Sequence, residues 1–160
     1  MAMRRMVRVG LCALMTAGVA ACGLVPPKPM RFYEGPELPR EQLAVLGARS
    51  PTPGSRSFVT VTKIDGTEIH PEGYALPTKG IYLKPRKALV SLRYMSFGGS
   101  TNARAEGDVE VDLKPGHFYV PEVRYLGGDR VLLRIQDKGT DYNPECLGTG
   151  MNHDRPAQGC

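Results

Sequence analysis

Apolar and polar residues alternate along several segments of the chain, which is the pattern of half-buried β-strands. The clearest case is Asp108–Leu113, where two valines and a leucine alternate with three carboxylates. A short turn near Pro39–Gln42 is the only helical candidate. Further strands are predicted at Leu43–Leu46, Phe58–Ile64, Thr67–Ile69, Ile81–Leu83, Lys87–Tyr94, His117–Tyr125 and Arg130–Asp137.

Gly, Pro and Asp residues separate these segments and predict tight turns. Asp65-Gly66 favours a hairpin, and Lys114-Pro115-Gly116 and Gly127-Gly128-Asp129 separate the last three strands. About seven short strands joined in this way predict an all-β fold, an antiparallel β-sandwich of immunoglobulin-like size, over residues 33–137. The chain has no Trp. It therefore lacks the Cys-Trp-Cys core of an antibody-type domain.

The first 21 residues have the features of a secretory leader. A basic head, Met1–Arg8, precedes thirteen uncharged residues at Val9–Ala21. About 20 apolar residues are needed to span a bilayer, so this segment is too short for a stable span. We therefore expect residues 1–21 to be a signal peptide that is removed.

The leader ends in a segment, Val19–Cys22, that resembles the bacterial lipobox. The resemblance implies cleavage before Cys22 and attachment of fatty acyl chains such as palmitate, through the Cys22 sulfur and the new amine. Gly23 then favours the outer membrane over retention in the inner membrane. The alternatives are an ordinary signal peptide with a chance cysteine and a cytosolic protein with an apolar start.

Residues 22–32 contain three prolines and predict a stiff, lipidated tether outside the fold. Removal of residues 1–21, which hold three arginines and no acid, lowers the formal net charge from +5 to +2. Nucleic-acid binding requires a concentrated basic face. A charge this small gives no reason to propose it, so the expected partners are the membrane, through the lipid, and an envelope protein.

Cys146 and Cys160 remain after the leader and the lipidated cysteine are set aside. Export places them in an oxidising compartment, where a pair of cysteines usually forms a disulfide. Closing a loop of about fifteen residues contributes about 3 kcal/mol in the chain-entropy model. We expect this disulfide to pin the tail, residues 138–160. A metal site formed by Cys146, His153 and Cys160 is the weaker alternative, because the spacing is loose.

Motifs of catalysis and cofactor binding are scarce. His70 and His117 stand apart, without a metal-binding HxxxH or HxH spacing. The chain has no Gly-x-Ser-x-Gly elbow, no phosphate-binding loop and no dinucleotide fingerprint. We therefore expect no metal, no cofactor and no catalytic residue.

Basic residues gather around one predicted turn. They are Lys79, Lys84, Arg86, Lys87 and Arg93. Such a group could bind an anionic headgroup or an acidic partner. A solvated sheet edge protected by charge is the favoured interpretation.

One segment after the tether carries a family resemblance. Tyr33–Pro36 (Tyr-Glu-Gly-Pro) leads into Leu38-Pro39 and the first predicted strand, and Ile64-Asp65-Gly66 and the Pro-containing turns at Leu83–Pro85 and Leu113–His117 follow. Together with the lipobox, these motifs resemble uncharacterised proteobacterial lipoproteins over Cys22 to about Asp137. Where that group tends to have Pro-Gly, this chain has Pro85-Arg86. The resemblance implies fold and location and no activity, and Tyr33–Pro36 is expected to dock the start of the domain onto the sandwich.

These observations predict a lipid-anchored periplasmic sandwich with a binding or structural role. The alternative is an envelope hydrolase with a site built from loops. The hydrolase predicts a concave pocket where His70 or His117 meets a carboxylate or hydroxyl. The binding module predicts an exposed apolar patch or an open edge strand.

Overall fold

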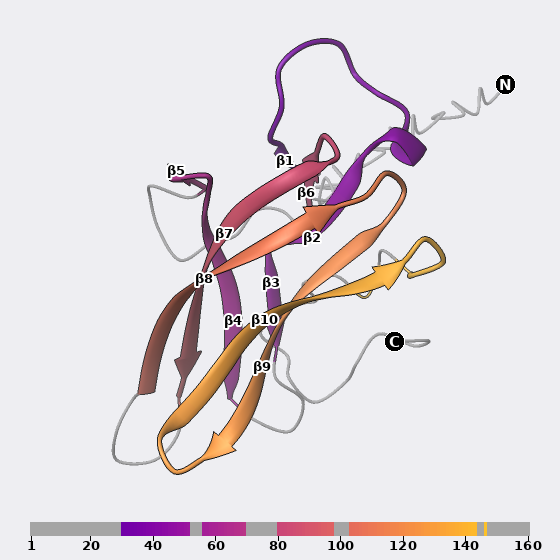
Figure 1. The fold of residues 1–160 in the computed structure, drawn as a ribbon. Coiled ribbons are helices and arrows are strands. Elements are labelled where there is room, and N and C mark those ends of the chain that lie inside the picture. Colours follow the sequence, from indigo (N-terminus) through magenta and orange to yellow (C-terminus); the bar gives the residue numbers. More distant parts are fainter. Residues whose placement is uncertain (1–29, 52–55, 70–79, 98–102, 144–145, 147–160) are drawn as a thin grey trace, which may run out of the picture.

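The structure is a computed structural model, and it describes residues 30–51, 56–69, 80–97, 103–143 and 146. These residues form ten strands in two facing sheets, with one turn of 3-10 helix, η1 (Figure 1). The elements are β1 (Met30–Arg31), η1 (Arg40–Gln42), β2 (Ala44–Gly47), β3 (Arg49–Pro51), β4 (Ser57–Ile64), β5 (Thr67–Glu68), β6 (Gly80–Leu83), β7 (Arg86–Ser96), β8 (Ala103–Leu113), β9 (Phe118–Gly127) and β10 (Arg130–Gly139).

Strand order defines the two sheets. The first sheet runs β1-β6-β2-β9-β10, and the second runs β3-β4-β7-β8, with β5 paired to β4. Most neighbours are antiparallel, whereas β1 pairs with β6, and β2 with β9, in parallel. The predicted all-β sandwich is confirmed. The described residues hold ten strands rather than about seven, and β7 and β8 are 11 residues long rather than short.

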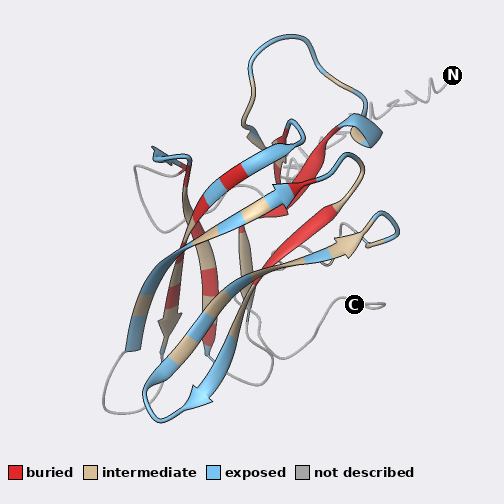
Figure 2. Ribbon diagram, viewed as in Figure 1, coloured by how far each residue is buried: buried red, intermediate tan, exposed pale blue. Residues whose placement is uncertain are grey.

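Alternation along the strands places the core between the two sheets. Buried residues alternate with less buried ones from Ser57 to Val61 in β4 and from Ala88 to Tyr94 in β7, as period-two patterning requires, and a bulge interrupts β4 between Val61 and Lys63 (Figure 2). The largest side chains enclosed there, all below 2% exposed, are Leu46, Val59, Val61, Ile64, Ile81, Leu83, Val90, Leu92, Leu113 and Tyr119. The lower parts of β8, β9 and β10 lie outside this enclosed region and are mostly exposed (Figure 2).

The chain changes sheets between β2 and β3. Leu46 pairs with Ile81 and Tyr119 in the first sheet, and three residues later Arg49 pairs with Thr60 in the second. Ala48 stands at the crossing, fully buried, and its carbonyl accepts the amide of Val61 at 2.9 Å. This short segment therefore joins the two layers covalently at the centre of the core.

The Asp-Gly hairpin predicted from the sequence is confirmed. Asp65 has φ 49° and Gly66 has φ 80°, and this left-handed pair closes β4 onto β5. Asp65 also anchors the turn to β7: its amide donates to the Leu89 carbonyl at 2.8 Å, and its carboxylate accepts the Leu89 amide at 2.9 Å. The turn is thereby attached to the second sheet at two points.

The folded region extends beyond residues 33–137 at both ends. Met30 and Arg31, in the predicted tether, pair with β6, and Met30 and Phe32 pack against the core. At the other end β10 continues to Gly139, and the Tyr142 ring lies 5.8 Å from that of Phe118 on the outer face. Apolar side chains at positions 30, 32 and 142 pack against the sheets. This packing explains why the folded region extends beyond the predicted bounds.

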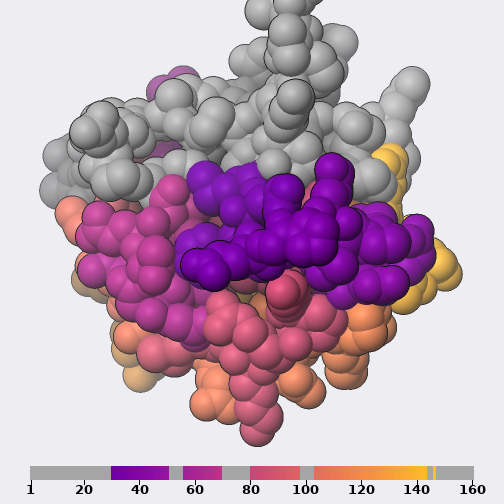
Figure 3. All heavy atoms as spheres, turned by 90° about the horizontal axis from the view of Figure 1, so that it is seen from above, coloured from indigo at the N-terminus to yellow at the C-terminus, as the bar shows by residue number. Residues whose placement is uncertain are grey.

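The first described residues, from Met30 to η1, lie across one end of the sandwich. Seen from above, they form a continuous indigo and purple band over this end (Figure 3). The Tyr33 hydroxyl accepts the Leu38 amide at 3.3 Å, and the Lys84 ammonium donates to the Glu34 carbonyl at 3.2 Å. Tyr33–Pro36 thus contacts its own loop and the β6–β7 turn, as a docking role requires. No helix in the described part of the chain has the length and apolar character to cross a membrane.

Candidate functional site

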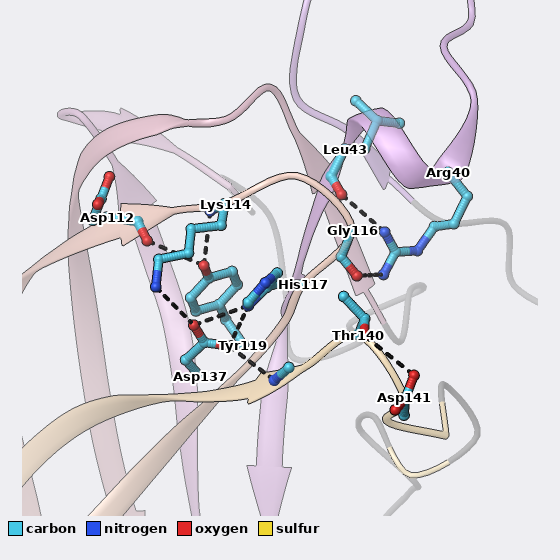
Figure 4. A network of polar contacts seen from close by, with 11 residues as sticks. Arg40, Leu43, Asp112, Lys114, Gly116, His117, Tyr119, Asp137, Thr140 and Asp141 are labelled. Carbon is cyan, nitrogen blue, oxygen red and sulfur yellow. Dashed lines mark hydrogen bonds and ion pairs between the residues drawn. The ribbon is translucent and has the colours of Figure 1, made fainter.

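His117 and Asp137 form a side-chain pair at the upper end of the sandwich (Figure 4). His117 stands directly before β9, and Asp137 lies near the end of β10, where the strand register sets it opposite Tyr119. His117 Nδ1 is 2.8 Å from Asp137 Oδ1 and 3.0 Å from Oδ2. The two side chains are 26% and 34% exposed, so the pair lies at the surface.

Tyr119 supports this pair from inside the core. Its hydroxyl accepts the Lys114 amide at 2.8 Å and donates to the Asp112 carbonyl at 3.1 Å, and its ring stacks on His117 with centroids 6.4 Å apart (Figure 4). Burial raises the pKa of Tyr119, and the nearby negative charges of Asp137 and Asp112 act in the same direction. The phenol therefore stays protonated and serves as a fixed donor and acceptor for the β8–β9 turn.

Arg40 joins the other side of the same turn to η1. Its guanidinium donates to the Leu43 carbonyl at 2.8 Å and to the Gly116 carbonyl at 3.1 Å (Figure 4). The same group lies 4.1 Å from the centre of the Phe118 ring. Burial lowers the pKa of Arg40 from its ordinary value, with Tyr82 and Glu41 opposing this effect. The group remains a cation, and its contacts hold η1 against the turn.

Among the described residues, the contacts of His117 do not include a hydroxyl or thiol nucleophile. An oriented histidine activates a hydroxyl or thiol that lies within hydrogen-bond reach. Within the described ranges, the His117 side chain hydrogen-bonds only to Asp137. The same residues contain no group of three His, Cys, Asp or Glu side chains that could hold a metal ion. The contacts instead tie the β8–β9 turn to β10.

Asp137 makes part of the stability dependent on pH. Partial burial raises the pKa of its carboxyl, but hydrogen bonds from the Gly139 amide and His117, with the charges of His117 and Lys114, outweigh burial and lower it below its ordinary value of 3.8. A lowered pKa stabilises the fold above the unfolded-state value, and this contribution is lost as pH falls through the folded-state value.

We expect Asp137→Asn to reduce the free energy of unfolding at pH 5, with a difference from the wild type that shrinks between about pH 4 and pH 2. Urea unfolding at each pH measures this. Asp141→Asn, which removes an exposed carboxylate of the same segment, is the control. A difference that stays constant down to pH 2 would refute the role of the Asp137 charge.

The second candidate is a pair of open sheet edges. Among the described strands, β8 pairs only with β7, and β10 pairs only with β9, so each ends its sheet. The two edges lie on the same side of the sandwich (Figure 1). Apolar side chains that point between the sheets here are only partly buried. They are Ala105, Val109 and Val111 on β8 and Val131, Leu133 and Ile135 on β10.

The outward faces of these edges carry opposite charge. On β8 the alternating outward residues are Glu106, Asp108, Glu110 and Asp112, after Arg104. On β10 they are Arg130, Leu132, Arg134, Gln136 and Lys138. Arg134 and Lys138 both bind Glu122 of β9, at 2.7 and 3.0 Å. The acids of β8 were evident from the sequence, whereas the basic face of β10 was missed, although its alternating cations are a signal in the sequence.

The predicted basic group around the β6–β7 turn divides into separate contacts. Lys84 donates to Glu34, Arg86 pairs with Asp65, and Arg93 pairs with Glu106 at 2.6 Å. These residues lie on β7 and the turn before it, and β7 is an inner strand rather than an edge. The favoured interpretation as solvated residues agrees with these exposed pairs, but the edge position predicted for them is wrong.

Several predicted site residues lie outside the described residues. These are Cys22, His70, Lys79, His153 and Cys160, together with the leader, residues 1–21, and most of the tether, residues 22–32. Of the predicted disulfide, only Cys146 is described. The pairing with Cys160, the lipidation of Cys22 and any contact of His70 therefore stay predictions.

Comparison with known proteins gives no match for this chain among family models, curated proteins or solved structures. The fold and the geometry of its edges are therefore the basis for function.

Proposed function

We propose that this chain is a lipoprotein anchored in the outer membrane, facing the periplasm, whose sandwich binds an envelope protein along the edges of β8 and β10. Residues 1–21 serve as its signal peptide, and lipid on Cys22 holds it to the bilayer. The sandwich stands on the membrane through the proline-rich segment after Cys22. The role is binding rather than catalysis.

The sequence supports this location. The basic head, the short apolar segment and the lipobox at Val19–Cys22 have the order and lengths that export and lipidation require. Two or three acyl chains anchor a protein far more firmly than one, because each buried methylene contributes about 0.8 kcal/mol. The resemblance to proteobacterial lipoproteins favours the same location. An oxidising periplasm also suits the predicted disulfide between Cys146 and Cys160.

The observation that carries the binding role is the pair of open edges. An exposed edge strand presents unpaired amides and carbonyls, to which an extended segment of a partner can add as a further strand. Beside these groups, Leu132 is 46% exposed and the inward valines of β8 are half-buried. Main-chain hydrogen bonds and apolar contacts are therefore both available to a partner along one side of the sandwich.

The hydrolase alternative has one observation in its favour, the hydrogen bond between His117 and Asp137. This pair orients an imidazole as a catalytic base would be oriented. Its surface position, and contacts that all serve the β8–β9 turn, favour a structural role. The binding function is therefore the better supported of the two.

Site-specific crosslinking in intact cells tests the binding role. A photoreactive phenylalanine replaces Glu110 on β8, Leu132 on β10, or Glu37 in the exposed loop before η1 as a control. We expect adducts from positions 110 and 132 to exceed those from position 37 severalfold, because only the two edges are occupied. Equal yields at all three positions would contradict the proposal.

A further inference from the structure

The two open edges run in the same direction. β8 ends at Leu113, directly before the β8–β9 turn, and β10 ends beside that turn, where Asp137 contacts His117. Figure 1 shows both arrowheads pointing toward the same end of the sandwich. Among the described strands, the molecule therefore presents on one side two edge strands that run parallel to each other and belong to different sheets.

The acidic outward face of β8 attracts the basic outward face of β10, and each face repels another copy of itself. Within the described part of the chain, Asp108 and Glu110 make no ion pair, and neither does Arg130. Unlike charges opposite each other on neighbouring strands stabilise the pairing of those strands, and like charges destabilise it. A β8 edge therefore disfavours another β8 edge and favours a β10 edge. If the charges served only to prevent aggregation, the same sign of charge on both edge strands would be sufficient.

We propose that the partner at these edges is a second copy of this chain, with β8 of each copy paired in parallel to β10 of the other. This inference rests on the proposed function and names the partner of the same surface. Each edge strand then gains a neighbouring strand, and the acidic outward residues of β8 in one copy lie beside the basic outward residues of β10 in the other. The two β8–β10 contacts are identical, so the assembly is a closed dimer.

A two-fold axis along the strand direction produces this arrangement. Such a rotation turns the open side of one copy toward the other and exchanges the layers, so that the first sheet of each copy continues into the second sheet of its partner. Strand direction is kept, which makes the new pairs parallel. The half-buried residues Val109, Val111, Val131 and Leu133 of both copies then close over one another and lose contact with water.

The membrane anchor favours the same axis. A rotation about the strand direction keeps both N-terminal segments at one end of the dimer, so lipids on both chains reach one bilayer. A two-fold axis perpendicular to the sheets would instead pair β8 with β8 and β10 with β10, acid against acid and base against base. It would also place the two anchors at opposite ends.

Charge reversal in the full, lipidated chain tests the dimer. Two tagged copies are co-expressed, extracted from the envelope in detergent, and their co-purification is measured. We expect Asp108→Lys with Glu110→Lys to reduce co-purification about tenfold or more, and Arg130→Glu with Arg134→Glu to do the same. The chain that carries all four changes has complementary edges again, and we expect co-purification to return.

Controls separate folding from association. Glu34→Lys with Glu37→Lys applies the same charge change away from the edges, and co-purification should stay at the wild-type value. Thermal melting identifies a variant that does not fold, and Arg130→Glu alone then replaces the basic set, because Arg130 has no ion pair to lose among the described residues.

The outcomes are distinct. The proposed dimer would be overturned if wild-type chains do not co-purify. It would also be overturned if the variant with all four substitutions folds and stays monomeric. If crosslinks from positions 110 and 132 then join a different protein, the proposed function stands and only the identity of the partner is wrong. If those positions give no adduct, both fail.

Discussion

Replacing Leu46 by alanine is expected to lower the free energy of unfolding by about 2–5 kcal/mol. Leu46 is 0% exposed and lies in the segment that crosses from the first sheet to the second. It sits between Ile81 and Tyr119 in the register, and neither neighbour belongs to a loop that could collapse into the space. The loss therefore combines the transfer free energy of the missing carbons with a residual cavity.

Urea unfolding at neutral pH measures this difference, and Leu89→Ala is the matched control. Leu89 is 46% exposed on the outer face of β7, so its truncation should cost well under 1 kcal/mol. Similar losses at the two positions would mean that the crossing segment does not pack as the structure describes. The result matters for function, because the crossing holds the two sheets, and hence their open edges, in a fixed relation.

Alternation predicted the long strands well. Along β4, β7, β8 and β10 the inward residues are apolar or small, except Arg86 at the start of β7 and Asp137 near the end of β10, and a period of two leaves no other regular structure that buries one face. β8 begins at Ala103, earlier than Asp108, because Ala105 and Gly107 continue the inward positions without a strong apolar signal. Local pattern therefore identified the strand and placed its start too late.

Two short strands, β1 and β3, were missed, whereas the short strands β2, β5 and β6 were predicted. β1 has two residues and gains its neighbour from β6, about fifty positions later in the chain. β3 has three residues and a proline at its end, and no strand was predicted there. Neither segment has enough length to show a period. Only the finished sheet provides the unpaired edges to which they add.

For the candidate sites too, the sequence shows the residue types but not which residues become neighbours. The sequence contains the acids of β8 and the cations of β10, but strand order, which sequence alone does not supply, decides that both strands are edges on one side. His117 and Asp137 are 20 residues apart, and the β9–β10 register brings them together. The residue types were predictable, whereas their neighbours required the fold.

The proposed function depends on residence in the cell envelope, which the predicted lipidation of Cys22 would provide. The thioether forms on one sulfur, so its replacement by oxygen should remove the modification completely rather than reduce it. Among the predictions made for this chain, this one has an all-or-none outcome. It requires no knowledge of the partner.

Labelling of cells with radioactive palmitate is the most direct measurement. We expect the wild-type chain, Cys12→Ser and Cys146→Ser to incorporate label, because these cysteines are not the acceptor, and Cys22→Ser to incorporate none and retain its leader. Label that persists in Cys22→Ser, or a wild-type chain that is never labelled, would contradict the account.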